Sequence, residues 1–256
     1  PQTFPMRLYP DVNRDPHIKK FSDFPTKDLK GETIASSERF RQLLLLHHPM
    51  SDYHQQVYLE SMEGVEMDSS MDSSDETQKP IFFTCRQSSL CCFPTTEEDP
   101  PVSLKYGRKG FSQVFRETTT RGLTSYSYRH SQGFFRQSTL ERYSAKLAAI
   151  ISYIKKSEGI VYVYSEYITT GILLLALALE ENGIPKWGSH QLLDSPTKAK
   201  PANNGSYIFV SGRSDLNPNL EDDLQQIKDT GNHDGSRIKV ILASPLGGEG
   251  LDLHNI

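Results

Sequence analysis

Three short apolar runs in the second half of the chain place the strongest constraint on its fold. The runs are GIVYVYS at 159–165, SYIFVSG at 206–212 and SRIKVILAS at 236–244. Each is rich in β-branched or aromatic residues and bounded by Gly or Ser, which is typical of buried strands. Helical patterns separate them, and strands that alternate with helices form a parallel sheet covered on both faces. The sequence therefore predicts an α/β fold here.

The helical patterns have clear local signals. Between residues 140 and 154 apolar side chains recur at three- and four-residue intervals, which predicts one amphipathic helix. The run TTGILLLALALEENG predicts a second helix, capped by Thr169 or Thr170 and closed by Gly183. A third, polar helix is predicted near 218–228.

The first part of the chain is less regular. Its one apolar run predicts a strand at 42–47, followed by a helix for which Ser51 is the N-cap. The interval 60–78 holds seven acidic residues and no Lys or Arg. It offers too little apolar surface to order itself, so we expect a disordered, solvated loop. A regulatory acidic tract is the alternative.

Residues 101–146 reverse the charge, with nine Lys or Arg against two Glu, and eight aromatic residues are interleaved. Cations pair with phosphates and aromatic rings stack on bases, so this composition is typical of single-strand nucleic-acid binding. The alternative is a segment whose rings pack on the core while its cations stay in solvent. The net charge of the whole chain is −4, so any nucleic-acid site must be local. The candidate phosphate ligands are Arg108, Lys109 and Arg116.

The cysteines and the apolar runs argue against a disulfide-stabilised, a zinc-binding or a membrane protein. An odd number of cysteines, which includes an adjacent pair, predicts inert thiols in a reducing compartment. Their spacing does not fit a zinc site, and we expect no metal ligands. The longest apolar run, 172–179, is too short to span a membrane, so no membrane association is expected.

Ligands of open parallel sheets bind at the carboxyl ends of the strands. There the third strand runs into the glycine-rich turn of ILASPLGGEGLDL, 241–253. Ser244 stands at the strand end, and Gly247 and Gly250 allow a ligand to approach the backbone closely. Asp252 can accept a hydrogen bond from a sugar hydroxyl. The alternative is a tight structural turn. The sequence has no GxxxxGK[ST] and no GxGxxG after the first strand, which argues against a P-loop or a dinucleotide site.

The segment ASPLGGEGLDL resembles motif V of superfamily 2 helicases, and GIVYVYSEYITTGILLLALALEENG is similar to their motif IV strand and following helix. LLLLHHPMSDYHQQVY and TCRQSSLCCFP are similar to segments of the helicase-like ATPases of nucleocytoplasmic large DNA viruses, relatives of Snf-type translocases. The resemblance covers about 35–256 and is most convincing over 139–256.

This resemblance implies a domain plan. Residues 1–58 would form the linker between motor lobes and the start of the second lobe. Residues 59–80 would be an acidic disordered insertion, and 81–138 a basic, aromatic-rich insertion. Residues 139–256 would be the C-terminal RecA-like lobe, a parallel three-layer fold that stops after motif V. The fold class expected is thus α/β, preceded by an irregular, partly disordered α+β linker region.

The resemblance also implies site roles. The positions on the nucleotide side of the cleft between lobes would be Gly250 and Asp252. Those along the nucleic-acid track would be Ser244, Gly247, Tyr164 and Ser165. The chain would contribute no catalytic residue, because it contains no Walker A motif, no DExx acid box and no QxxGRxxR motif, so by itself it is not expected to hydrolyse ATP.

The implied function is the second motor lobe of an ATP-dependent helicase or translocase, with ATP and Mg²⁺ held mainly by a first lobe. Its partners would be nucleic acid, DNA rather than RNA, and that first lobe, with viral transcription machinery as a further partner. It would act inside cells, in host cytoplasm, a viral factory or a virion. One alternative is a viral transcription-factor-type DNA-dependent ATPase that works as a binding module. Another is an unrelated α/β enzyme such as a methyltransferase, which the missing glycine-rich loop disfavours.

Overall fold

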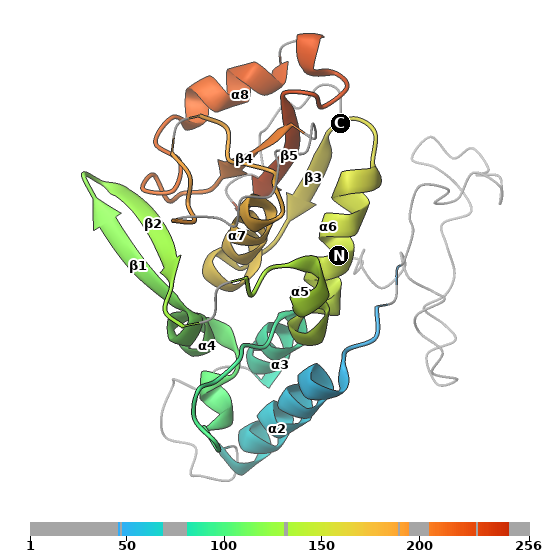
Figure 1. Ribbon diagram of the computed structural model, residues 1–256, viewed down its shortest axis with the longest axis vertical. Helices are drawn as coiled ribbons and strands as arrows, with labels where there is room; N and C mark the ends of the chain where they lie inside the picture. The colour runs from blue at the N-terminus through green and yellow to red at the C-terminus, as the bar shows by residue number, and fades with distance from the viewer. Residues whose placement is uncertain are drawn as a thin grey trace, which may run out of the picture. The chain divides into compact units, whose positions relative to one another are not determined.

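A computed structural model describes residues 46, 48–68, 81–130, 133–188, 190–194, 205–228 and 230–245. From His48 onward these residues belong to one compact unit. They form a mixed α/β fold in which helices surround a three-stranded parallel sheet, with a two-stranded antiparallel hairpin beside it (Figure 1). The strand predicted at 42–47 lies outside the described residues, Leu46 excepted.

The sheet consists of β3 (Val161–Tyr164), β4 (Ser206–Val210) and β5 (Ile238–Ala243). Its order is β3-β5-β4, and both pairs are parallel. The three predicted strands and their parallel arrangement are therefore confirmed. The central strand β5 is buried along its whole length, whereas β3 is only half-buried. The prediction that β3 is a buried strand is wrong, because among the described residues it has a neighbouring strand on one side only.

Helices cover both faces of this sheet. Side chains of α6 (Ala145–Lys156) and α7 (Leu173–Glu181) share one core cluster with Val240 and Leu242 of β5. The alternate residues of β5 pack in a second cluster with α8 (Leu220–Lys228). Because successive side chains of a strand point to opposite faces, the two clusters make three layers. The short helix η4 (Thr230–Asn232) leads from α8 toward β5.

The helix α2 (Asp52–Asp68) begins where the sequence predicts it. Ser51 Oγ accepts a hydrogen bond from the His54 N–H at 3.1 Å, which confirms the N-cap. The helix continues to Asp68, so the prediction of a disordered loop from residue 60 is wrong over 60–68. Glu60 accepts a hydrogen bond from Lys105 Nζ at 2.9 Å, and the buried Ser61 hydroxyl donates to Ser88 Oγ at 2.8 Å. These contacts order the first acidic turn; residues 69–80 lie outside the described part.

The single helix predicted over 140–154 is two helices, α5 (Gln137–Tyr143) and α6. Ser144 separates them with an extended backbone, φ −160° and ψ 91°. Its Oγ accepts the Leu147 N–H at 3.1 Å and donates to the Leu90 carbonyl at 2.6 Å. A buried serine that caps one helix and bonds a distant carbonyl outweighs the unbroken apolar spacing, which by itself favours continuity.

The turn after β3 differs from its prediction. Thr169 and Thr170 do not cap α7; they lie inside a π-helical turn, η3 (Ile168–Ile172), that runs directly into it. Gly171 is needed in this turn, since a Cβ there would lie 2.3 Å from Ser165 Oγ. The predicted helix end is confirmed. Gly183 has φ +84°, and the Ile184 N–H bonds the Leu179 carbonyl at 2.9 Å.

The segment between α2 and the sheet is regular rather than irregular. It comprises α3 (Ile81–Leu90), η2 (Val102–Leu104), α4 (Gly107–Val114) and the hairpin of β1 (Phe115–Thr120) and β2 (Leu123–Tyr128). Five of its eight interleaved aromatic residues are fully buried and belong to the same core cluster as the sheet: Phe111, Phe115, Tyr126, Phe134 and Phe135. The interpretation of these rings as base-stacking surfaces is therefore wrong. Burying a large ring in the core stabilises the fold, whereas a ring kept exposed for a ligand contributes no such stabilisation.

The cysteines are free thiols, and two of them, Cys91 and Cys92, are buried. Burial raises the pKa of the Cys92 thiol to about 12, so it stays protonated, as predicted for an inert thiol. Among the described residues, no helix has both the length and the apolar character needed to cross a membrane.

Candidate nucleic-acid interface

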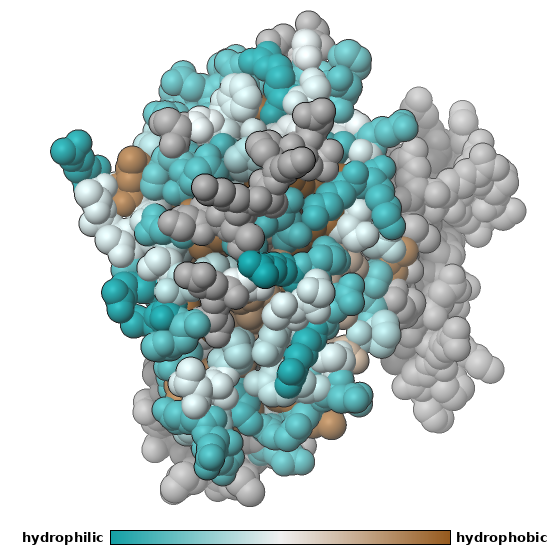
Figure 2. Space-filling view, in the orientation of Figure 1, coloured by the Kyte–Doolittle hydropathy of each residue, from teal (hydrophilic) through white to brown (hydrophobic). Residues whose placement is uncertain are grey.

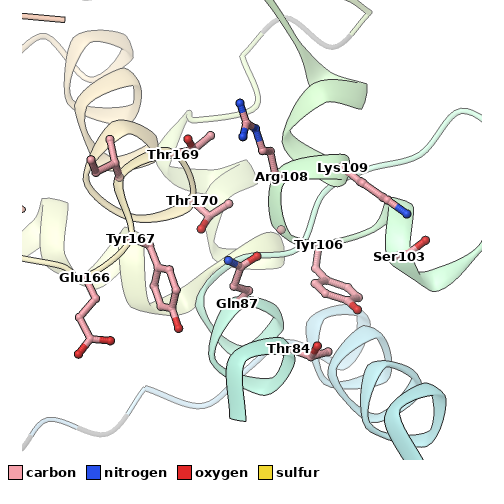
Figure 3. Close-up of a pocket in the computed structure, with 12 residues that line it drawn as sticks. Thr84, Gln87, Ser103, Tyr106, Arg108, Lys109, Glu166, Tyr167, Thr169 and Thr170 are labelled. Atoms are coloured by element: carbon pink, nitrogen blue, oxygen red, sulfur yellow. The ribbon is translucent and has the colours of Figure 1, made fainter. Parts of the chain in front are cut away.

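A pocket of about 600 Å³ opens beside the turn that follows β3, at the carboxyl end of that strand. Figure 3 shows that this turn faces α3 on one side and the start of α4 on the other. The pocket is lined by Thr84, Gln87, Ser103, Tyr106, Gly107, Arg108, Lys109, Glu166, Tyr167, Ile168, Thr169 and Thr170. It thus joins the basic segment to the edge of the sheet at which ligands of parallel sheets bind.

Hydrogen bonds that continue past the strand ends fix this edge. The Ser165 N–H donates to the Ala243 carbonyl at 3.1 Å, and the Ser244 N–H donates to the Val210 carbonyl at 3.0 Å. The Tyr167 N–H bonds Ser165 Oγ at 3.2 Å, which turns the chain toward the pocket. The sheet edge and the pocket wall are therefore held by one short, bonded segment.

The first turn of α4 carries an unusual charge pattern. It contains Arg108 and Lys109 and no acidic residue, although cations are unfavourable at a helix N-terminus. Both side chains are exposed, and within the described ranges neither forms a salt bridge. Gly107 has φ +62°, and a Cβ there would lie 2.6 Å from Gln87 Oε1, so α3 and α4 approach closely here.

One acidic residue, Glu166, also lines the pocket, and it is paired. Glu166 accepts from Arg86 Nη1 at 3.1 Å, in a pair whose side chains are 59% and 62% exposed. Such an exposed pair adds little stability, but it offsets the one acid that lines the pocket. Among the lining residues, Arg108 and Lys109 against Glu166 leave a net charge of +1 (two minus one), and Glu166 is itself paired with Arg86, which does not line the pocket. The pocket is therefore suited to an anionic ligand.

The side chains divide the pocket into zones (Figure 3). The Arg108 guanidinium lies beside Thr169, and Lys109 points toward Ser103. Below these basic groups in the view, Tyr167 and Tyr106 lie on either side of Gln87. Burial raises the pKa of Tyr106, whose hydroxyl also bonds the Thr84 side chain, so it remains a neutral hydrogen-bonding group. The arrangement offers positive charge, aromatic surface and amide groups together.

The structure places the site residues predicted from the sequence in different locations. Tyr164, which is 49% exposed, and Ser165 lie at the same sheet edge as Ser244, since Tyr164 pairs with Ala243. Ser244 is only 2% exposed. The structure brings Arg108 and Lys109 to the pocket, whereas Arg116 is exposed on β1 and does not line it. The positions Gly247, Gly250 and Asp252 lie outside the described residues.

Several pocket residues were missed by sequence reasoning, notably Thr84, Gln87 and Tyr106. The sequence contained one signal for these residues. Thr84 and Gln87 are three residues apart on α3, so they share a helix face, and the polar KYGRKG run follows downstream. Only the fold shows that this face meets the turn after β3.

The surface around these elements is polar. Figure 2 shows that described residues on the visible face are largely hydrophilic, with hydrophobic ones in small separate spots. Within the described part of the chain, no group of three or more His, Cys, Asp or Glu is placed to hold a metal ion. No family model matches the chain, and no curated protein matches it significantly.

Proposed function

We propose that this chain is the nucleic-acid-binding second lobe of an ATP-dependent helicase or translocase. The observation that carries the proposal is the pocket at the carboxyl end of β3 that is lined by two exposed cations, Arg108 and Lys109. Support also comes from the parallel three-layer arrangement, in which the strand of the motif IV-like segment ends, and the motif V-like segment begins, at the same edge of the sheet. A RecA-like lobe has this arrangement.

In this proposal the two cations of α4 bind phosphates of one strand. Charge-assisted hydrogen bonds from Arg are stronger than neutral ones, and each neutralised phosphate releases counterions. Tyr164 exposes half of its surface beside the pocket, and an exposed ring there offers a base a stacking platform. The strand would run along the sheet edge from α4 toward Ser244.

The ATP site would lie in the cleft between this lobe and a first lobe. Gly250 and Asp252 would face the nucleotide there, while ATP and Mg²⁺ would be held mainly by the first lobe. The P-loop lysine, the Mg²⁺-holding acid and the arginine finger are not recognisable in this chain, so ATP turnover by the chain alone, above a blank with single-stranded DNA, would contradict the proposal.

Removing both pocket cations tests the nucleic-acid contact. We expect Arg108→Ala with Lys109→Ala to weaken binding of single-stranded DNA and to reduce the slope of log K against log salt by about 1.4, near 0.7 for each lost phosphate contact. Fluorescence anisotropy over a salt series measures both. Arg121→Gln, which removes one exposed charge from the hairpin tip, is the control and should leave the slope unchanged. An unaltered slope in the double variant contradicts the proposed phosphate contact.

A further inference from the structure

The pocket has a larger volume and more kinds of side chain than phosphate binding requires. Phosphates are bound on open surfaces by exposed cations, as Arg108 and Lys109 would bind them. The pocket that they help to line, however, has a volume of about 600 Å³, which is within the range of about 300 to 1,000 Å³ that small-molecule sites occupy. Such a site can enclose a whole nucleotide, whereas a duplex is too wide to enter.

The side chain of Gln87 is placed to recognise a base. It lies in the pocket between two tyrosines (Figure 3), and its Oε1 is held against Gly107, where a Cβ would approach within 2.6 Å. Among the described residues its side-chain amide has no hydrogen-bond partner. A glutamine amide presents a donor and an acceptor side by side, which matches the edge of a base.

The walls favour a planar, aromatic ligand. Tyr106 and Tyr167 flank Gln87, and Ile168 adds apolar surface. Base–aromatic stacking tolerates any base because every base has a π-face. A phosphorylated peptide would use the cations equally well, but it would leave the amide and the two rings without a matching group. The chemistry therefore favours a nucleotide over a phosphopeptide.

We infer that the pocket captures one unpaired nucleotide of a strand, with its base beside Gln87 and its phosphate near Arg108. This inference rests on the proposed nucleic-acid function and narrows it to a strand with at least one unstacked base. A paired base would have to leave the duplex first, which costs a few kcal/mol of lost stacking and pairing. The site would thus discriminate single strands from duplexes.

Strands with and without bases test the inference. We expect the chain to bind a short oligo(dA) about tenfold more tightly than an abasic strand of equal length and charge, or a hairpin duplex, the effect of losing about one stacked base. Gln87→Leu keeps the size and helix preference of the residue; it should weaken oligo(dA) binding about fivefold and leave abasic binding unchanged. Gln113→Leu, an exposed glutamine of α4 outside the pocket, is the matched control.

The possible results distinguish nucleotide capture from phosphate binding alone. Equal binding of oligo(dA) and the abasic strand, still sensitive to Arg108→Ala with Lys109→Ala, overturns nucleotide capture and leaves phosphate binding intact. Displacement of oligo(dA) by a phosphopeptide at lower concentration than by a mononucleotide also overturns it. If no nucleic acid binds even at low salt, the proposed function fails together with the inference.

Discussion

Replacing Glu180 with alanine is expected to destabilise the fold by about 3 kcal/mol or more, because each buried donor left without an acceptor costs about 1–3 kcal/mol. Glu180 is 4% exposed and accepts from the Leu192 N–H at 2.9 Å, the Leu193 N–H at 2.6 Å and the Tyr207 hydroxyl at 2.6 Å. Urea unfolding measures the loss. Glu158→Ala, at an exposed position, is the control and should change stability little.

The Glu180 network also predicts a pH dependence. Its three donors favour the carboxylate, but burial outweighs them and raises the pKa of Glu180 from 4.5 to about 7. A folded-state pKa above the unfolded value contributes stability that is present below the unfolded pKa and is lost as pH rises through the folded one. Glutamine does not titrate. Relative to Glu180→Gln, the free energy of unfolding of the wild type should therefore fall by up to about 3 kcal/mol as the pH rises from about 4.5 to about 7. If the difference in the free energy of unfolding between the wild type and Glu180→Gln is the same at every pH in this window, the assigned effect of burial on the pKa of Glu180 is wrong.

The same network has a structural consequence. The Leu192 carbonyl accepts the Tyr126 N–H at 2.7 Å, and the Asp194 N–H donates to the Tyr126 carbonyl at 2.7 Å. Glu180 of α7 therefore holds the 192–194 segment against β2. It links the sheet to the hairpin that follows α4, and so helps to keep α4 in place beside the turn after β3.

Phe115→Ala is the second substitution with a large expected effect, a loss of about 3–5 kcal/mol in the free energy of unfolding. Phe115 is 1% exposed, and its ring centroid lies 4.9 Å from that of Phe111 and 5.3 Å from that of Phe135. Deleting the ring leaves a cavity at the centre of this aromatic cluster. Thermal or urea unfolding gives the measurement.

The neighbouring residue supplies the control for Phe115. Arg116→Ala changes an exposed side chain of the same strand and should alter stability by about 0.5 kcal/mol at most. It should also weaken nucleic-acid binding less than loss of the pocket cations, since Arg116 does not line the pocket. A folded Phe115→Ala protein with unchanged stability would contradict the assigned role of this ring in the core.

Regular elements around the sheet could be predicted from the sequence because their signals are local. The runs that became β3, β4 and β5 are β-branched or aromatic and bounded by turn residues, and the alternation with helices determined that the sheet is parallel. Gly183 ends its helix through a positive φ, and Ser51 begins another through a side-chain cap. Each of these features is decided by a few neighbouring residues.

The predictions that failed depend on contacts between distant segments. Ser144 breaks a helical pattern because its hydroxyl bonds the Leu90 carbonyl, 54 residues away. Glu60 is ordered by Lys105, 45 residues away. Composition could not distinguish rings that stack on bases from rings that form a core, since both uses favour the same residues. The pocket likewise required α3, α4 and the turn after β3 to meet.

Mapping photo-crosslinks between the chain and a single-stranded oligonucleotide tests the central claim most directly, because it locates the contact rather than the affinity. After irradiation and digestion, mass spectrometry of the adducts should place them in the peptides that contain residues 103–109 and 164–170, with Tyr106, Tyr164 and Tyr167 as the aromatic acceptors nearest the proposed strand. Arg108→Ala with Lys109→Ala should reduce the adducts at both segments. Adducts confined to other parts of the chain, or none at a salt concentration that permits binding, would contradict the account.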